Sequence, residues 1–217
     1  MITARLQAVR ARIARACEAA GRDPSEVTLV AVSKVHPVAS IASAYEAGQR
    51  DFGESYAQEL RDKAGELPDD VRWHFIGRLQ TNKAKYVAPR AYRVHALTEV
   101  KQVEALVRRA TGPVRGMLAV HLGDEASKGG VPPEIALTRA RELDAVQGFE
   151  ITGLMTIPPP EGAALYFEQL AELAAEGCRA GLQLTELSMG MSGDFEVAIR
   201  YGATHVRVGT AIFGPRT

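Results

Sequence analysis

Eight β-rich runs alternate with helical stretches along the chain, and this alternation constrains its fold more than any other feature. The runs cover residues 27–33, 50–55, 72–77, 92–97, 114–122, 149–157, 184–190 and 205–213. Helices are predicted between some of them, at 38–48, 100–110, 133–146 and 162–177. Several runs are apolar on both alternating faces, as buried parallel strands are. Because parallel strands need crossover connections, eight such units in succession predict an α/β fold, a closed (β/α)8 barrel of the TIM type.

Two further patterns support this architecture. An open, doubly wound sheet would favour a G-x-G-x-x-G turn after the first strand, whereas this first strand ends in SKVHP at 33–37. Before that strand, Ile2, Leu6, Val9 and Ile13 recur at helical spacing, and Gly21 follows as a stop signal. The sequence therefore predicts an extra N-terminal helix ahead of the barrel.

The composition is that of an ordinary globular protein. Of 217 residues, 46% are hydrophobic and 24% charged, and 26 basic side chains balance 26 acidic ones. A formal net charge of zero gives no general attraction to nucleic acid or membrane, so we expect neither as a partner. The N-terminus lacks a secretory apolar stretch and no later run is long enough to span a bilayer, which favours a cytoplasmic protein. The length favours one domain over residues 1–217.

Cysteine and histidine spacing gives no support to a metal site. Cys17 and Cys178 stand far apart, so we expect two buried thiols and no disulfide or zinc site. No H-x-H or H-E-x-x-H pattern occurs. We expect hydrogen-bonded pocket or surface roles for the five histidines, which are His36, His74, His95, His121 and His205.

The loops after the seventh and eighth strands carry the clearest signal of a ligand. In barrels of this type, these two loops commonly form a phosphate-binding cup. Ser192 is predicted at the start of a helix, where backbone N–H groups favour an anion, and Gly209-Thr210 offers a second set of donors. Each feature alone is better explained by a helix cap or a turn glycine. Together, at the two phosphate loops, they favour a phosphate site.

Lys34 ends the first strand and is predicted at the mouth of the same barrel. An amine whose stem lies against apolar neighbours loses its proton more easily than one in water, as imine formation requires. Taken alone, a lysine there is better explained as one that extends to solvent or pairs with the phosphate. A phosphate cup with a mouth lysine suits pyridoxal phosphate (PLP), and it also suits an aldolase acting on a phosphorylated sugar.

The chain resembles the pyridoxal phosphate homeostasis proteins, which are single-domain relatives of the N-terminal barrel of alanine racemases. The resemblance runs through nearly the whole chain from Val27. It rests on LVAVSKVHPV (29–38), AYEAGQRDFGESYAQEL (44–60), WHFIGRLQTNKAKY (73–86), GLMTI (153–157), ELSMGMSGDFEVAI (186–199) and VRVGTAIFGPR (206–216). It implies a PLP barrel of fold-type III that buffers or delivers the cofactor and acts in amino-acid and keto-acid balance.

The resemblance also implies roles for individual residues. Lys34 would hold PLP as an internal aldimine, Ser192, Gly209 and Thr210 would bind its phosphate, and Arg207 would face the pyridine nitrogen. We add two further candidate cofactor-binding residues at the ends of the second and seventh strands, Ser55 and Met189.

Two positions depart from the family pattern. Ser55 stands where the family usually has asparagine, and His121 stands where it often has asparagine at the end of the fifth strand. Both are predicted at the cofactor end of the barrel, so these lateral contacts to the ring differ from those of the family.

The chemistry favours a carrier over an enzyme, and we assign no catalytic residue. Related racemases use a tyrosine from a second domain across a dimer, and this sequence ends at Thr217, directly after the eighth strand. An arginine at the ring nitrogen also weakens the ring as an electron sink. We expect PLP as ligand, PLP-dependent apoenzymes as candidate recipients, and a monomer or weak dimer. A racemase or Schiff-base lyase on the same barrel is the alternative.

Overall fold

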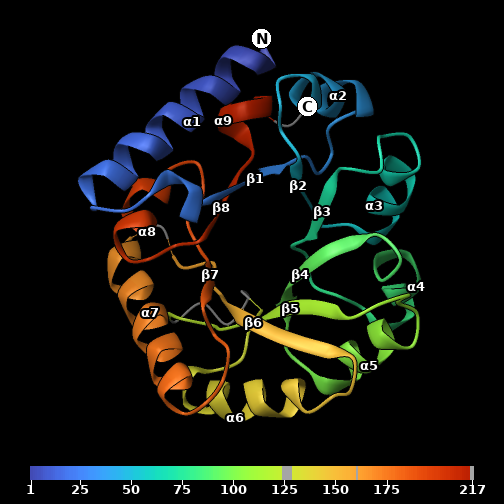
Figure 1. The fold of residues 1–217 in the computed structure, drawn as a ribbon, viewed down its shortest axis with the longest axis vertical. Coiled ribbons are helices and arrows are strands. Elements are labelled where there is room, and N and C mark those ends of the chain that lie inside the picture. The colour runs from blue at the N-terminus through green and yellow to red at the C-terminus, as the bar shows by residue number, and fades with distance from the viewer. Residues whose placement is uncertain (124–128, 160, 216–217) are drawn as a thin grey trace.

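Parallel strands close into a barrel surrounded by helices (Figure 1). The computed structural model describes residues 1–123, 129–159 and 161–215. Within these residues eight strands pair in sequence order, and β8 closes the ring against β1. The strands are β1 (Thr28–Val32), β2 (Asp51–Glu54), β3 (Arg72–Phe75), β4 (Ala91–Leu97), β5 (Val114–Ala119), β6 (Phe149–Met155), β7 (Glu186–Ser188) and β8 (His205–Val208). The predicted (β/α)8 barrel is confirmed.

Helices α2 to α8 connect successive strands on the outside of the ring, while α1 precedes β1 and α9 follows β8 (Figure 1). They are α1 (Ile2–Ala19), α2 (Val38–Glu46), α3 (Ala57–Ala64), α4 (Ala84–Val87), α5 (Val100–Val107), α6 (Pro133–Asp144), α7 (Ala163–Arg179), α8 (Phe195–Arg200) and α9 (Thr210–Phe213). Each of the eight predicted strands overlaps an observed strand, and the four predicted crossover helices match α2, α5, α6 and α7 within a few residues.

The last predicted strand is too long. We expected β structure over 205–213, but β8 ends at Val208 and residues 210–213 form helix α9. The segment Thr-Ala-Ile-Phe is mostly apolar, and four residues are too few to distinguish a helical period from a strand. The change of direction at Gly209 brings a helix start to the end of β8.

The extra N-terminal helix is confirmed as α1, and its apolar stripe explains where it lies. Leu6, Val9 and Ile13 are buried, and the helix packs against α2, α8 and α9. Gly21 has a positive φ of 64° just past the helix end, and its N–H donates to the carbonyl of Glu18. The helix therefore covers the seam where β8 meets β1.

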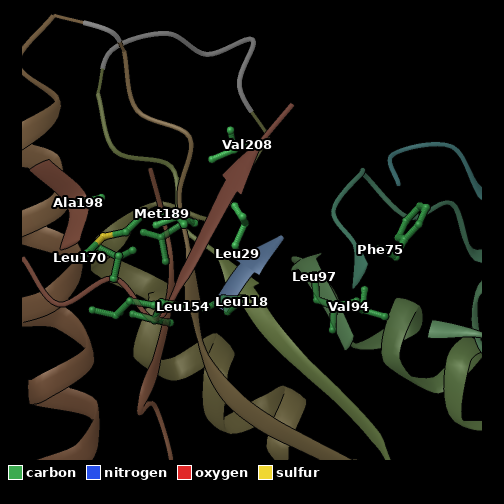
Figure 2. Close-up of a cluster of buried hydrophobic side chains, with 14 of the residues drawn as sticks. Leu29, Phe75, Val94, Leu97, Leu118, Leu154, Leu170, Met189, Ala198 and Val208 are labelled. Atoms are coloured by element: carbon green, nitrogen blue, oxygen red, sulfur yellow. The ribbon is translucent and has the colours of Figure 1, made fainter. Parts of the chain in front are cut away.

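The main apolar core lies between the strands and the surrounding helices (Figure 2). Its members include Leu29, Val94, Leu118 and Leu154 from four different strands, all buried. Removing such a side chain to alanine typically costs about 2–5 kcal/mol, because the surrounding atoms collapse only partly into the space. This layer fixes the strands, and therefore the positions of the loops that follow them.

The inside of the barrel is unusually polar. Residues two apart on a strand point to the same side, so Asp51 and Ser55 of the β2 region face inward while Phe52 packs outward into the core. On β8 the same alternation turns His205 and Arg207 inward. Both of these side chains are buried.

The two cysteines differ from each other. Cys17 is buried on α1, and burial raises the pKa of its thiol. Cys178 is exposed near the end of α7, so the expectation that both thiols are buried was wrong for it. Cys178 comes four residues after the buried Ala174, but the buried stripe of α7 continues through Gly177, and Cys178 is exposed in the last turn of the helix.

Neither a metal cluster nor a membrane span is found in the part of the chain that the structure describes. No group of three or more His, Cys, Asp or Glu side chains there could hold a metal ion. None of the helices in those residues has the length and apolarity needed to cross a membrane. Arg216 and Thr217, which the sequence analysis named, lie outside the described residues.

Candidate functional site

A cavity of about 270 Å³ opens at the carboxyl ends of the strands, where the phosphate cup is predicted. Loops after β1, β2, β3, β6, β7 and β8 contribute to its wall. It is lined by Val32, Lys34, His36, Ser55, Ile76, Ile157, Met191, Ser192, Gly193, Arg207, Gly209 and Thr210. One amine, one guanidinium, one imidazole, three hydroxyls and two glycines therefore face a single small space.

Most of the residues predicted for the site meet in this cavity. Those that line it are Lys34, Ser55, Ser192, Arg207, Gly209 and Thr210. Two of the positions considered depart from the family pattern, and of these Ser55 lines the cavity whereas His121 does not. His121 is half-buried beyond the end of β5, and its backbone N–H donates to the carbonyl of Val131.

Met189 lies outside the cavity lining. It is fully buried in the outer core, where Figure 2 shows it among Leu170 and Ala198. Its neighbour Ser188 points the opposite way, into the barrel, because successive residues of a strand alternate in direction. Met191, two residues further along, is the methionine that lines the cavity.

The loop after β7 presents Ser192 through a turn, without placing it at the helix terminus itself. Helix α8 begins at Phe195 with Asp194 as its N-cap, so the prediction that Ser192 opens the helix was wrong by two residues. Asp194 Oδ1 accepts a hydrogen bond of 2.6 Å from the backbone N–H of Met191, which closes the turn. Ser192 and Gly193 at its tip line the cavity.

The loop after β8 brings backbone close to the cavity. Gly209 is the N-cap of α9 and Thr210 its first residue. A Cβ on Gly209 would come within 3.2 Å of the carbonyl oxygen of Val32, so a larger residue would press against β1. The first N–H groups of a helix have no partner within that helix. This loop can therefore offer backbone donors as well as the Thr210 hydroxyl.

Lys34 lies in a strained turn. The next residue, Val35, has φ of 62°, a left-handed conformation that β-branched residues rarely adopt. Strain of this kind costs about 1–3 kcal/mol and persists only where neighbouring contacts impose it. Here the neighbouring contacts lie on both sides of Lys34.

A buried ion-pair cluster imposes the turn. Lys63 on α3 donates to the carbonyl of Ser33 at 2.9 Å, to Glu54 at 2.8 Å and to Glu59 at 2.7 Å. Glu59 in turn accepts from the backbone N–H of Val35 at 2.8 Å, and Glu54 accepts from the Ser33 hydroxyl at 2.7 Å. The residues immediately before and after the mouth lysine are therefore both held by one cluster.

The two carboxylates of this cluster differ in the direction in which their surroundings shift the pKa. Burial raises the pKa of Glu54 above its ordinary value, against the opposing effect of Lys63. For Glu59, burial also acts upward, but hydrogen bonds from Lys63 and Val35 leave its pKa below the ordinary value. Lys63 is thus the cation that keeps the buried carboxylate of Glu54 in place.

Arg207 forms the inner wall of the cavity. Its guanidinium donates to Ser188 Oγ at 2.6 Å and to the carbonyl oxygen of Thr156 at 2.8 Å. Burial lowers the pKa of Arg207 to about 10, with Asp194 opposing this effect, so the side chain is cationic at neutral pH. It is the fixed positive charge that a ligand in this cavity meets.

A larger cavity of about 980 Å³ adjoins this one. Ser55 lines both, and the larger one continues along α3 and the 81–83 turn past Arg78, Lys83 and Lys101. Lys34 and the loops after β7 and β8 are not part of its lining. The smaller cavity is the candidate site, because it brings the mouth lysine and the two phosphate loops together.

Sequence reasoning missed several residues of the site. His36, Ile76 and Met191 line the cavity but were not predicted to belong to it. The ring of His36 lies against Phe213, with centroids 5.1 Å apart. All three follow closely after strand ends, so the barrel rule that selected their neighbours could have found them too.

The family comparison covers almost the whole chain. Residues 4–217 match the family model described as "Alanine racemase, N-terminal domain". The chain is 44% identical over 216 residues to the pyridoxal phosphate homeostasis protein of Pseudomonas aeruginosa, covering 96% of this chain and 93% of the relative. It is 42% identical over 221 residues to that of Aquifex aeolicus, covering 98% and 97%.

A solved structure has a fold similar to that of this chain. The structure of PipY from Synechococcus elongatus PCC7942 with PLP bound superposes with a TM-score of 0.84. The two sequences are 36% identical, and the match covers 99% of this chain and 100% of PipY. The barrel described above is therefore similar to one whose solved structure contains PLP.

Proposed function

The chain belongs to the alanine racemase N-terminal domain family and, within it, to the pyridoxal phosphate homeostasis proteins, and we propose that it is an intracellular PLP carrier. It binds PLP through Lys34 and takes part in buffering or delivering the cofactor. The observation that carries this proposal is the meeting of Lys34, Arg207 and the two phosphate loops in one cavity.

The donor set of the cavity fits the cofactor. Ser192, Gly193, Gly209 and Thr210 form a neutral cup of hydroxyls and close backbone, which suits a phosphate ester. Lys34 supplies an amine for the aldehyde. Bound PLP supplies an aldehyde for reversible attachment to amines and a ring that withdraws electrons.

The polar side chains have distinct roles in this proposal. Lys34 attaches the cofactor covalently through Nζ, and Arg207 donates to the ring nitrogen from the cavity wall. Ser192 and Thr210 donate to the phosphate. Ser55 borders the ring laterally, with a shorter side chain than the asparagine usual in the family.

The methionine that lines the cavity is not the one that was predicted to do so. Met189 was predicted to bind the cofactor, but its side chain lies in the outer core and does not line the cavity. It supports the loop from the core side. Met191 lines the cavity and is the better candidate for an apolar contact with the cofactor.

The arrangement favours carriage over catalysis. Arg207 is a cation at neutral pH and would keep a facing ring nitrogen unprotonated, which limits how strongly the ring withdraws electrons. Racemisation also needs acid–base groups on both faces of the bound substrate. His36 is a cavity residue that could act as an acid–base group, and it is the observation that keeps the racemase alternative open.

The remaining features of the proposal follow from the carrier role. We propose that the whole chain forms a single binding domain and that it works in the cytoplasm as a monomer or weak dimer. Its recipients would be PLP-dependent apoenzymes, whose own lysines compete for the same aldehyde. Because attachment at Lys34 is reversible, the aldehyde can leave Lys34 and attach to a lysine of the recipient by the same chemistry.

We expect loss of the two loop hydroxyls to weaken PLP binding strongly. In a Ser192→Ala, Thr210→Val double variant, each lost charge-assisted hydrogen bond costs about 1.5–3 kcal/mol. Equilibrium titration of apo-protein with PLP measures the effect. Ser43→Ala is the control, because Ser43 bonds to its own helix at Ala39 and does not line the cavity.

The same titration with pyridoxal separates phosphate recognition from general binding. Wild type should bind pyridoxal poorly, and the double variant should lose most of its preference for the phosphate ester. Equal affinities of wild type for pyridoxal and PLP would mean that the two loops are only turns and caps.

Wild type should racemise alanine at a negligible rate. Replacing Arg207 by glutamate should favour a protonated ring nitrogen and raise slow side transamination of added amino acids. Chiral chromatography of alanine and detection of pyridoxamine phosphate measure the two reactions. Rapid racemisation by wild type that disappears in Lys34→Ala would replace the carrier by the enzyme alternative.

A further inference from the structure

A line of hydrogen-bonded side chains crosses the inside of the barrel. Asp51 Oδ1 lies 2.9 Å from His74 Nε2, and His74 Nδ1 lies 2.9 Å from His95 Nε2. His95 Nδ1 lies 2.7 Å from Ser188 Oγ, which accepts from Arg207 at 2.6 Å. The line joins residues of β2, β3, β4, β7 and β8. None of its first four members lines the candidate site.

The two ends of this line lie at opposite mouths of the barrel. Arg207 lines the cavity at the carboxyl ends of the strands. Asp51 and His74 line a separate cavity of about 350 Å³, together with Arg72 and Tyr92. Asp51 also accepts two hydrogen bonds from Arg72 there. The line therefore connects the candidate site to the far side of the molecule.

Arg207 fixes the direction of the hydrogen bonds from one end. A guanidinium has only donors, so Ser188 Oγ must accept from it. Ser188 is buried, and in the described part of the chain the only other partner of its Oγ is His95 Nδ1, so the hydroxyl proton is satisfied only if His95 Nδ1 accepts it. His95 carries its own proton on Nε2 and donates it to His74 Nδ1.

Asp51 fixes the same direction from the other end. Burial acts to raise its pKa, but hydrogen bonds from His74 and Arg72 leave that pKa below the ordinary value. An ionised carboxylate can only accept, so His74 must donate from Nε2, and a neutral His74 then accepts at Nδ1. For neutral histidines, both ends therefore place the ring proton on Nε2.

Burial favours these neutral rings. His74 and His95 are fully buried, and burial lowers the pKa of both. His205 packs against both rings, with centroids 5.8 Å from that of His74 and 5.5 Å from that of His95, and burial lowers its pKa as well. Three imidazoles that resist protonation therefore lie together inside the barrel.

The charges around the two linked histidines act in the same direction, with one exception. The cations Arg72, Arg93 and Arg207 oppose protonation of His74 or His95. Asp51 is the anion that favours protonation of His74, but burial, Arg93 and Arg72 together outweigh it and leave the pKa of His74 below its ordinary value. The linked rings are therefore neutral at neutral pH, and neutral rings fix the directions of the hydrogen bonds.

We propose that Asp51, His74, His95 and Ser188 are positioning residues for Arg207, joined in one directed hydrogen-bond chain. The chain holds the guanidinium at the cavity wall and makes its placement depend on the carboxylate at the opposite mouth. Its effect on cofactor binding rests on the proposed function, whereas its proton positions do not.

The first test reads the proton positions directly in the apo-protein. Nitrogen-15 NMR of labelled histidines should show His74 and His95 as neutral rings with the proton on Nε2 at neutral pH. A proton on Nδ1 of either ring, or a charged imidazolium, would overturn the directed chain. This measurement needs no cofactor, so it decides the chain even if the protein does not bind PLP.

The second test asks whether Asp51 acts on the site through the chain. Ser188→Ala should weaken PLP binding about tenfold, by leaving a guanidinium donor unpaired. Asp51→Asn should weaken it about threefold, because a charge-assisted hydrogen bond becomes a neutral one. In the Ser188→Ala background, Asp51→Asn should have no further effect, because the connection is already broken.

A matched control separates the chain from the general field of the protein. Asp70 is a carboxylate that pairs with Arg50, the residue just before β2. The Asp70→Asn variant also removes one carboxylate, and it should leave PLP binding unchanged. Additive effects of Asp51→Asn and Ser188→Ala, or equal effects of Asp51→Asn and Asp70→Asn, would overturn the proposal. Thermal unfolding of each apo-variant verifies that the comparison is made between folded proteins.

Discussion

Replacing Lys34 with alanine should abolish the visible absorbance that arises when PLP is attached to the protein, while the apo-protein keeps its fold. The lysine amine is the group to which we assign the attachment, and no other described residue that lines the cavity supplies one. The side chain is half-buried at the barrel mouth, outside the apolar core. Its removal should change the free energy of unfolding by no more than about 0.5 kcal/mol.

Absorption spectra after addition of PLP, together with circular dichroism of the apo-protein, measure the two effects. Lys83→Ala and Lys85→Ala serve as controls, since Lys83 lines the larger cavity and Lys85 is exposed on the surface beside it. A linkage that remains reducible by borohydride in Lys34→Ala would transfer the attachment to another lysine.

Replacing Lys63 with methionine should destabilise the fold strongly. Lys63 is buried and holds Glu54, Glu59 and the carbonyl of Ser33. Breaking a buried ion pair from one side typically costs about 3–5 kcal/mol, because the partner charge remains buried and uncompensated. Urea denaturation measures the loss, with the exposed Lys85→Met as a control expected within about 0.5 kcal/mol of wild type.

The pH dependence of this variant has a definite sign. Without Lys63, burial of Glu54 is no longer opposed by a cation, so the pKa of Glu54 in the folded state rises further above its unfolded value. A raised folded pKa stabilises the protein below the unfolded pKa, and this contribution is lost as pH rises through the folded pKa. Lys63→Met should therefore fall further behind wild type as pH increases from about 5 to 8.

A second substitution tests the cause. Glu54→Gln in the Lys63→Met background removes the buried charge and should recover about 1–3 kcal/mol. A deficit that stays constant with pH, or a double variant no more stable than Lys63→Met, would mean that Lys63 stabilises the turn by packing alone.

The barrel and the meeting of the candidate cofactor-binding residues were predictable because both depend on short-range patterns combined with one topological rule. The apolar runs indicated the strands, and the rule that strand ends share one mouth predicted that Lys34, Ser192, Arg207 and Thr210 lie together. In the structure all four residues line one cavity, as this rule predicted.

What could not be predicted depends on contacts across the barrel or on very short segments. The helix at 210–213 is too short to show a period, and the cap at Asp194 was mistaken for one at Ser192 because either residue is a good helix cap. His95 meets Ser188 across 93 positions of sequence. No local pattern marks that contact, so the sequence predicts only unrelated pocket or surface histidines.

The backbone conformation of the turn at Lys34 also could not be predicted from the local sequence. Valine is a poor choice for a left-handed conformation, and nothing in the local sequence predicts one at Val35. The turn is imposed by Glu59 and Lys63, which lie more than twenty residues away on α3. Local propensity is overridden here by a buried cluster whose members carry no recognisable sequence pattern.

The residue that attaches PLP can be identified directly, and this measurement tests the carrier hypothesis at its centre. Wild-type protein is loaded with PLP, reduced with borohydride and digested, and the modified peptide is identified by mass spectrometry. We expect a single pyridoxyl label on Lys34. A label on Lys63, Lys83 or another lysine, or no label on a protein that binds PLP, would contradict the proposed attachment.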